Sequence, residues 1–237
     1  MIEIFFILLF FILCLIAYFS SNNRKKSLWI SVEGIIGAGK TTLIKSILPH
    51  LEDSFGSDTI LVVDEPVEKW IESGHLERCT QEPYVAQTYF FHTRVQRFLE
   101  LTKDGDAKII ISERSMISDR YIFWETTCMN GLVSELAQKT YPHLWSTWTK
   151  LLNGREPDLY IYLELDADTS QKRMLERNRS EEKDVVSIDY QKQLVEAHER
   201  VFKMYRTIKI SSSRNFRDDP AVARDIAEQI IQIIKTL

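Results

Sequence analysis

The chain has 237 residues, and its 30 lysines and arginines against 34 aspartates and glutamates give a formal net charge of −4. This length fits one α/β domain or at most two small ones. A composition of 44% hydrophobic and 27% charged residues excludes a disordered chain and a multi-spanning membrane protein. The slightly acidic balance argues against a general nucleic-acid-binding protein, so we expect no nucleic-acid partner.

The first segment of interest is an unbroken apolar run over residues 4–19, followed by Arg24, Lys25 and Lys26. As a helix it would be about 24 Å long, which approaches the ~30 Å hydrocarbon core of a bilayer. Positive charge after the run, and not before it, argues against a cleaved signal peptide and places the following residues on the cytoplasmic side. Residues 1–26 are therefore predicted to be a membrane anchor with a basic flank, and the rest of the chain to face the cytoplasm. A cleaved leader or a short interfacial segment is the alternative.

Residues 27–237 contain no linker, repeat or low-complexity tract, so they are predicted to form one domain. Short apolar, β-branched runs predict strands at Leu28–Glu33, Thr59–Asp64, Lys108–Ser112, Leu159–Leu165 and Thr207–Ser211. Helices are predicted between and after them at Lys40–Leu51, Pro83–Thr102, Ser115–Cys128, Ser134–Leu152, Thr169–Arg177, Asp189–Tyr205 and Pro220–Lys235. This alternation predicts an α/β fold with a five-stranded parallel sheet flanked by helices, and ligands at the carboxyl ends of the strands.

The first predicted strand runs directly into a glycine-rich segment with the Walker A spacing, and a predicted helix follows. Its backbone N–H groups can converge on phosphate oxygens, Lys40 can reach the β- and γ-phosphates, and the Thr41 hydroxyl can coordinate Mg²⁺. The predicted phosphate-binding residues are Gly34, Gly37, Ala38, Gly39, Lys40, Thr41 and Thr42. ATP or GTP binding is therefore predicted. The chain has no Asn-Lys-x-Asp segment for reading guanine, which disfavours a GTPase.

Two further predicted strands end in charged residues, with Glu65 after one and Glu113-Arg114 after the other. A carboxylate at a strand end can take the proton of a hydroxyl acceptor. An adjacent arginine can neutralise charge that develops on a transferred phosphoryl group. Both strands should open at the same edge of the sheet as the phosphate loop.

At this point the sequence resembles the deoxynucleoside kinase family. The features that carry the resemblance are the phosphate loop, Glu65-Pro66-Val67 with Trp70, Gln87-Thr88-Tyr89, Glu113-Arg114-Ser115 with Asp119-Arg120-Tyr121, and Arg173, Arg177 and Arg179 before Ser180-Glu181-Glu182. They follow the family order across nearly all of residues 28–237. The resemblance implies a P-loop kinase fold with an arginine-rich lid, and ATP-dependent phosphorylation of a deoxynucleoside for nucleotide salvage.

The resemblance also implies roles for the charged residues. Glu65 is implied as the general base for the 5′-hydroxyl, and Arg114 as the group that holds this hydroxyl and the incoming phosphoryl group. Glu113 is implied to help Thr41 position Mg²⁺. Arg173, Arg177 and Arg179 match the lid arginines over the ATP phosphates, and Glu182 matches the residue that binds the sugar 3′-hydroxyl.

For the base, the resemblance implies that Trp70 lies beside the pocket, that Gln87 pairs with the base edge and that Phe123 stacks on the ring. Arg94 and Asp119 match a charged pair of the deoxycytidine and purine-deoxynucleoside branch. We therefore expect dC, dA or dG to be preferred over thymidine. Phe90 is bulkier than the small residue usual at its position and could narrow the pocket around a pyrimidine 5-substituent. Two departures from the family bear on substrate choice. Ile35 stands where the loop usually has an asparagine, and no tyrosine lies near Leu76, where the family's sugar-binding tyrosine is expected.

Two other functions remain open. A thymidylate kinase-like enzyme acting on a monophosphate is disfavoured because its usual Glu-Pro-Gly segment reads Glu65-Pro66-Val67 here. A non-catalytic membrane scaffold on the same fold should have lost catalytic residues, and Lys40 and Glu113 are present. A stripe of aromatic residues, Tyr141, Trp145 and Trp148, is typical of a core or of a subunit interface, so a homodimer is also expected.

Overall fold

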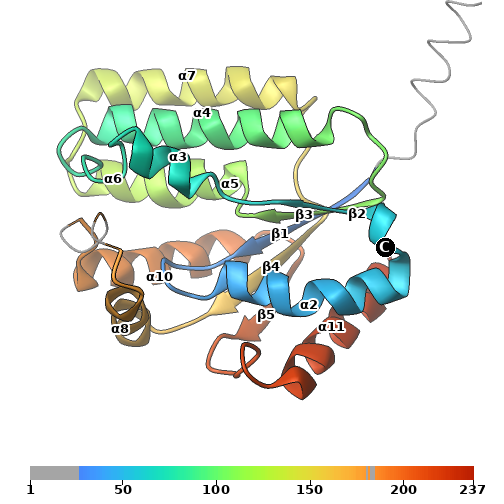
Figure 1. The fold of residues 1–237 in the computed structure, drawn as a ribbon. Coiled ribbons are helices and arrows are strands. Elements are labelled where there is room, and N and C mark those ends of the chain that lie inside the picture. Colours follow the sequence, from blue (N-terminus) through green and yellow to red (C-terminus); the bar gives the residue numbers. More distant parts are fainter. Residues whose placement is uncertain (1–26, 180, 182–184) are drawn as a thin grey trace, which may run out of the picture.

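A sheet of parallel strands organises the protein (Figure 1). The computed structural model describes residues 27–179, 181 and 185–237. Within these residues the sheet has five strands in the order β2-β3-β1-β4-β5. Their bounds are β1 (Leu28–Glu33), β2 (Ile60–Val63), β3 (Ile109–Glu113), β4 (Leu159–Glu164) and β5 (Thr207–Ser211). Every neighbouring pair is parallel, so all five strands end at the same edge.

Helices cover both faces of the sheet. They are α2 (Lys40–Phe55), α3 (Val67–Glu72), α4 (Pro83–Thr102), α5 (Met116–Ser118), α6 (Glu125–Met129), α7 (Glu135–Leu151), α8 (Ala167–Arg177), α10 (Ile188–Phe202) and α11 (Pro220–Ile234), with a short 3₁₀ turn η1 (Ser57–Thr59) and a π-helix η2 (Asp119–Trp124). Helices α2 and α11 lie on one side of the sheet, and α4 and α7 on the other (Figure 1). The predicted α/β fold with a five-stranded parallel sheet flanked by helices is confirmed.

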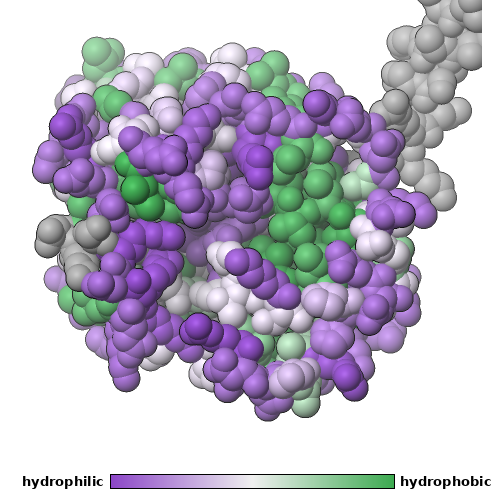
Figure 2. Space-filling model, in the orientation of Figure 1, coloured by the Kyte–Doolittle hydropathy of each residue, from purple (hydrophilic) through white to green (hydrophobic). Residues whose placement is uncertain are grey.

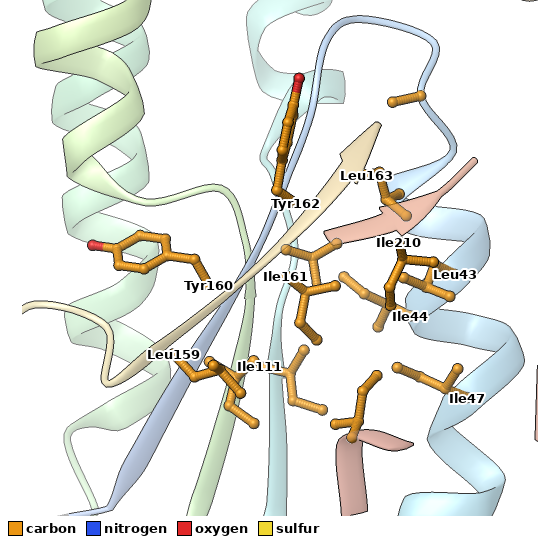
Figure 3. Packing of buried hydrophobic residues seen from close by; sticks show 14 of the residues in the cluster. Leu43, Ile44, Ile47, Ile111, Leu159, Tyr160, Ile161, Tyr162, Leu163 and Ile210 are labelled. Atoms are coloured by element: carbon orange, nitrogen blue, oxygen red, sulfur yellow. The ribbon is translucent and has the colours of Figure 1, made fainter. Parts of the chain in front are cut away.

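The core explains why the strands are apolar along almost their whole length. On one face, Leu43, Ile44 and Ile47 of α2 are directed toward Ile161 and Ile210 of the sheet (Figure 3), and all five side chains are at least 96% buried. Residues next to Ile161 on β4 point to the opposite face, where aromatic rings of α10 pack against them. A strand with helices on both faces has no side left for polar residues.

Side-chain caps fix where several helices begin. Ser134 accepts a hydrogen bond from the first turn of α7, Asp166 does the same for α8, Ser187 for α10 and Asp219 for α11. These residue types are favoured before a helix because their oxygens satisfy N–H groups that have no partner within the helix.

The structure differs from the prediction between Ser115 and Cys128. This segment was predicted as one helix, and it is helical but changes its winding from α5 to the π-helix η2 and back to α6. Short π-helical turns within α-helices are frequently found at functional sites. The six-residue helix α3 was not predicted, because it is too short to give a periodic pattern.

The prediction that the chain is anchored in a membrane is corrected. No helix within residues 27–179, 181 and 185–237 is long and apolar enough to cross a bilayer. The apolar run over residues 4–19, on which the predicted N-terminal apolar helix and the membrane location rested, lies outside the described residues.

Candidate active site

One cavity of about 720 Å³ lies where strands β1, β2 and β3 end. The recess in the middle of the face in Figure 2 is bordered mostly by hydrophilic residues. The predicted site residues that line the cavity are Gly37, Lys40, Thr41, Glu65, Trp70, Gln87, Arg94, Glu113, Arg114, Asp119, Phe123, Arg177 and Arg179. The structure thus brings together side chains that are spread over some 140 positions of the sequence.

The phosphate loop follows β1 and ends where α2 begins. The Lys40 ammonium is buried and lies 3.4 Å from the carbonyl oxygen of Ile35 and 4.0 Å from Oε1 of Glu113. Burial lowers the pKa of Lys40 and the nearby positive charge of Arg114 lowers it further, to about 8, although neighbouring carboxylates act in the opposite direction. This buried ammonium is held at the loop, and its ion pair with Glu113 is long, at 4.0 Å.

Three buried donors from other elements hold the loop from outside. The carbonyl of Ile36 accepts hydrogen bonds from the Ser170 hydroxyl and from Nε2 of Gln191, the latter at 3.0 Å. The carbonyl of Ala38 accepts one from the Ser212 hydroxyl at 2.5 Å. These donors come from α8, from α10 and from the segment after β5. Because they bind the carbonyls on the outside, they favour a conformation in which the N–H groups of the loop face the ligand.

Thr41 and Glu113 form the part of the site that fits a divalent cation. The Thr41 hydroxyl donates to Oε2 of Glu113 at 2.7 Å, so two oxygen ligands already lie together beside Lys40. Hydroxyl and carboxylate oxygens are the ligands that Mg²⁺ prefers. The backbone at Gly37 is also consistent with a phosphate-binding loop. Its φ is +87°, and an added Cβ would lie 2.9 Å from the Ser170 carbonyl, so only glycine fits this turn.

Glu65 is held by two arginines through a single oxygen. Its Oε1 accepts from Nη1 of Arg94 at 2.9 Å and lies 3.3 Å from Nε of Arg114. Its Oε2 makes no hydrogen bond with the described part of the chain. Burial by itself raises the pKa of Glu65, but the positive charges of Arg94, Arg114 and Lys40 outweigh this effect and lower the pKa to about 2. Glu65 is therefore an ionised carboxylate with one oxygen left for a ligand.

Arg94 also binds Asp119, so it bridges two carboxylates. Its Nε lies 2.8 Å from Oδ2 of Asp119 and its Nη2 3.2 Å from Oδ1, a bidentate pair in which both side chains are almost fully buried. Burial raises the pKa of Asp119, and the charge of Arg94 opposes that rise. Burial by itself lowers the pKa of the Arg94 guanidinium, but the charges of Asp119 and Glu65 outweigh this effect and raise the pKa above its usual value, so Arg94 remains charged.

Arg114 has an unusual backbone and an incomplete set of partners. Its φ is +67°, in the left-handed region that costs a residue other than glycine about 1 kcal/mol or more. The guanidinium packs 4.6 Å from the ring centre of Phe123. Its side chain is 97% buried, yet Nη1 has no hydrogen-bond partner among the described residues. A strained, buried cation with an unused donor indicates a site for an anionic or polar ligand.

Aromatic side chains form part of the cavity wall. The Trp70 indole donates to the Thr93 hydroxyl at 2.7 Å, and its ring lies 4.5 Å from that of Phe90. Gln87 is 92% buried and faces the cavity, and its amide makes no hydrogen bond with the described residues. A buried amide that is not satisfied by the protein is suited to reading the polar edge of a ligand.

Some predicted residues are placed elsewhere. Arg173 does not line the cavity, because its guanidinium donates to the hydroxyl and the carbonyl of Ser212, at 2.9 and 3.0 Å. Gly34, Ala38, Gly39 and Thr42 belong to the loop and the start of α2 but are not among the lining residues. Glu182 lies outside the described residues.

The sequence did not indicate Tyr190 and Cys79 as lining residues, and it marked Leu76 only as a departure from the family. Tyr190 lies on α10, in a stretch whose pattern was that of an ordinary amphipathic helix. Cys79 and Leu76 lie in the segment between α3 and α4, where no motif could be recognised. The only sequence signal for these lining residues was weak, namely the presence of apolar residues within a short loop.

A glycine-rich loop between a strand and a helix, a buried lysine, and carboxylates with an arginine in one cavity are together typical of a phosphate-loop kinase. The family model for deoxynucleoside kinases matches residues 30–235. A probable deoxycytidine kinase of fowlpox virus (strain NVSL) is 31% identical over 220 residues, covering 88% of each chain. Human deoxycytidine kinase is 29% identical over 231 residues, covering 84% of each chain. Human mitochondrial thymidine kinase 2 is 31% identical over 183 residues, covering 74% of this chain and 64% of the relative.

The chain belongs to the deoxynucleoside kinase family. It is therefore a nucleoside kinase, and the interpretation as a kinase that acts on nucleosides is confirmed.

Proposed function

We propose that residues 27–237 form a kinase domain that transfers the γ-phosphate of ATP to the 5′-hydroxyl of a deoxynucleoside, in nucleotide salvage. The single observation that carries the proposal is the arrangement of Glu65, which lines the same cavity as Lys40 and whose Oε1 is held by Arg94 and Arg114. A fixed carboxylate beside a phosphate-binding loop is what transfer to an alcohol requires.

Glu65 acts as the general base, although its pKa is about 2. Phosphoryl transfer passes through a loose transition state in which the attacking hydroxyl loses its proton late, so a weak but well-placed base is sufficient. The hydroxyl proton moves to Oε2 as the new O–P bond forms. Arg114, with Nη1 still unused, neutralises the charge on the transferred group.

The residues around the phosphate loop fit ATP and Mg²⁺. Lys40 and the loop N–H groups bind the phosphates, with Arg177 and Arg179 closing over them from the end of α8. Thr41 and Glu113 are the residues that would hold Mg²⁺, which supplies charge neutralisation when it is bound.

We propose that dC, dA or dG is preferred over thymidine. Each of these bases carries an exocyclic amino group, which can donate a hydrogen bond to the Asp119 carboxylate or the Gln87 amide oxygen, whereas thymine has no amino group. Phe90 narrows the same wall, which disfavours a pyrimidine with a 5-methyl group. Trp70 and Phe123 supply apolar surfaces for contact with the base. A homodimer through the helices remains a further part of this proposal.

The test is a panel assay on the purified protein with ATP and Mg²⁺. We expect dC, dA or dG to be converted to the 5′-monophosphate with a higher kcat/KM than thymidine, as measured by chromatography of the products. Phosphorylation of dCMP or TMP in place of the nucleosides would contradict the proposal and favour a monophosphate kinase. A protein that binds ATP but phosphorylates none of these compounds would contradict it as well.

A second expectation concerns the pH dependence of ATP binding. Because the pKa of Lys40 is lowered to about 8, the free protein loses this positive charge as the pH rises above 8. The affinity for a non-hydrolysable ATP analogue should then weaken by up to about tenfold per pH unit above that value. Calorimetric titration at pH 7 and pH 9 measures the change. The affinity for the nucleoside serves as the control, and an ATP affinity that is the same at both pH values would refute the role of Lys40.

A further inference from the structure

Glu33 is a buried carboxylate that the proposed mechanism does not use. It is the last residue of β1, directly before the phosphate loop, and it is not among the residues that line the cavity. Its surface is completely buried. A carboxylate inside a protein is costly unless it is hydrogen-bonded or paired with a charge, so the partners of Glu33 indicate what it stabilises.

Both oxygens of this carboxylate accept a hydrogen bond from a serine hydroxyl. Oε1 accepts from Ser31, two residues earlier in β1, at 2.7 Å. Oε2 accepts from Ser118, the last residue of α5, at 2.5 Å. Both serines are completely buried. The first hydrogen bond stays within β1, whereas the second ties β1 to the segment that follows β3 and joins residues 85 positions apart.

The segment tied to β1 in this way carries Arg114. Arg114 directly follows β3, and its backbone N–H donates to the carbonyl of Val32 at 3.0 Å. It therefore lies between two attachments to β1, the hydrogen bond to Val32 and, four residues later, the hydrogen bond from Ser118 to Glu33. The φ of +67° at Arg114 persists only if the surrounding structure enforces it. The two attachments supply such a constraint from both sides.

The charge of Arg114 also acts on Glu33. Burial raises the pKa of Glu33, and the positive charge of Arg114 is the largest effect that opposes this rise. The carboxylate and the guanidinium are thus close enough for their charges to interact. This proximity agrees with the hydrogen bonds, which place Glu33 against the segment that carries Arg114.

We propose that Glu33 is a positioning residue that acts through the Ser118 hydroxyl to hold Arg114 in its strained conformation at the cavity. This inference rests on the proposed function, in which the unused Nη1 of Arg114 neutralises charge on the transferred phosphoryl group. Such a contact depends on accurate placement, since a shift of about 1 Å can cost about 10²-fold in rate. Glu33 does not line the cavity, so its effect on the reaction passes through Arg114.

The experiment compares Ser118→Ala with its matched control Ser31→Ala. Each variant removes one hydroxyl from the same buried carboxylate, but only Ser118→Ala breaks the link to the segment that carries Arg114. Ser118→Ala should lower kcat by about 10- to 100-fold and change KM for ATP by less than about threefold, because Arg114 acts in the transition state. Ser31→Ala should keep kcat within about threefold of wild type, although denaturant unfolding shows a similar loss of stability for both variants.

Glu33→Gln is the conservative variant. Its amide can accept a hydrogen bond from one serine and donate one to the other, so it should retain the link and a kcat above that of Ser118→Ala. A loss as large as that of Ser118→Ala would show that the negative charge, and not the hydrogen bond, is what matters, and would overturn the inference.

A double-mutant cycle with Arg114→Met tests whether the effect passes through Arg114. In the Arg114→Met background, Ser118→Ala should lower the residual kcat no further. A full additional loss there would overturn the inference, as would equal losses of kcat with both serine variants, or an unchanged kcat with Ser118→Ala. In each of these cases wild type still phosphorylates nucleosides, whereas a wild type that phosphorylates none would remove the proposed function and this inference together.

Discussion

Glu65→Gln is expected to lower kcat by about 10²- to 10⁴-fold while the affinity for ATP stays close to that of wild type. Glutamine keeps the size of the side chain and can still accept hydrogen bonds from Arg94 and Arg114 through its amide oxygen. It cannot take the proton of the acceptor hydroxyl. Single-turnover kinetics, together with calorimetric titration of an ATP analogue, separate the loss of chemistry from any loss of binding.

Glu72→Gln is a suitable control, because it makes the same change on an exposed position of α3, the helix that follows the Glu65 segment. This variant should keep the wild-type rate. If Glu65→Gln also kept that rate, another group would have to be the base, and the assignment of Glu65 would be wrong.

Arg94→Met is expected to have the largest effect on stability. It leaves the carboxylates of Glu65 and Asp119 buried without the guanidinium that binds both. Removing one partner of a buried ion pair typically destabilises a protein by about 3–5 kcal/mol, because the remaining charge is uncompensated. Denaturant unfolding at pH 7 measures this loss.

The same variant should shift the pH dependence of activity. The pKa of Glu65 is held at about 2 partly by Arg94, so loss of that positive charge raises the pKa and protonates the base at a higher pH. The acid limb of the kcat profile should move toward neutral pH.

Arg97→Met is the control for the stability measurement. Its partner Asp64 is 2.7 Å away, and the two side chains are 39% and 54% exposed, so loss of this ion pair should cost about 1 kcal/mol or less. Equal stability of the two variants would mean that the buried pair is not important for folding.

Much of the fold could be predicted from sequence because its signals are local. The strand Leu28–Glu33 is a continuous apolar run, and the structure gives it the same bounds. The glycine and lysine spacing after it depends on backbone geometry within nine residues, which a sequence records directly. The winding of Asp119–Trp124 could not be predicted, because an α-helix and a π-helix have the same composition and differ in hydrogen bonds that tertiary packing selects.

The interactions between the site residues were harder to predict from sequence than the identity of those residues. Arg94 was expected to pair with Asp119, and it does, but its hydrogen bond to Glu65 joins residues 29 positions apart in separate elements. Arg173 and Arg177 are four residues apart on one helix, which predicts a common role. In the structure Arg173 instead donates a hydrogen bond to Ser212, a residue that directly follows β5. Neither outcome is encoded in local spacing.

The three donors behind the phosphate loop have a consequence for the kinetics of nucleotide capture. Since Ser170, Gln191 and Ser212 already hold its carbonyls, the loop has lost its conformational freedom before any nucleotide arrives. The entropic cost of ordering the loop is incurred during folding. Association with the nucleotide therefore does not require a rearrangement of this segment. Substitutions that remove any of these three donors should therefore slow the association of the nucleotide, although none of the three residues lines the cavity.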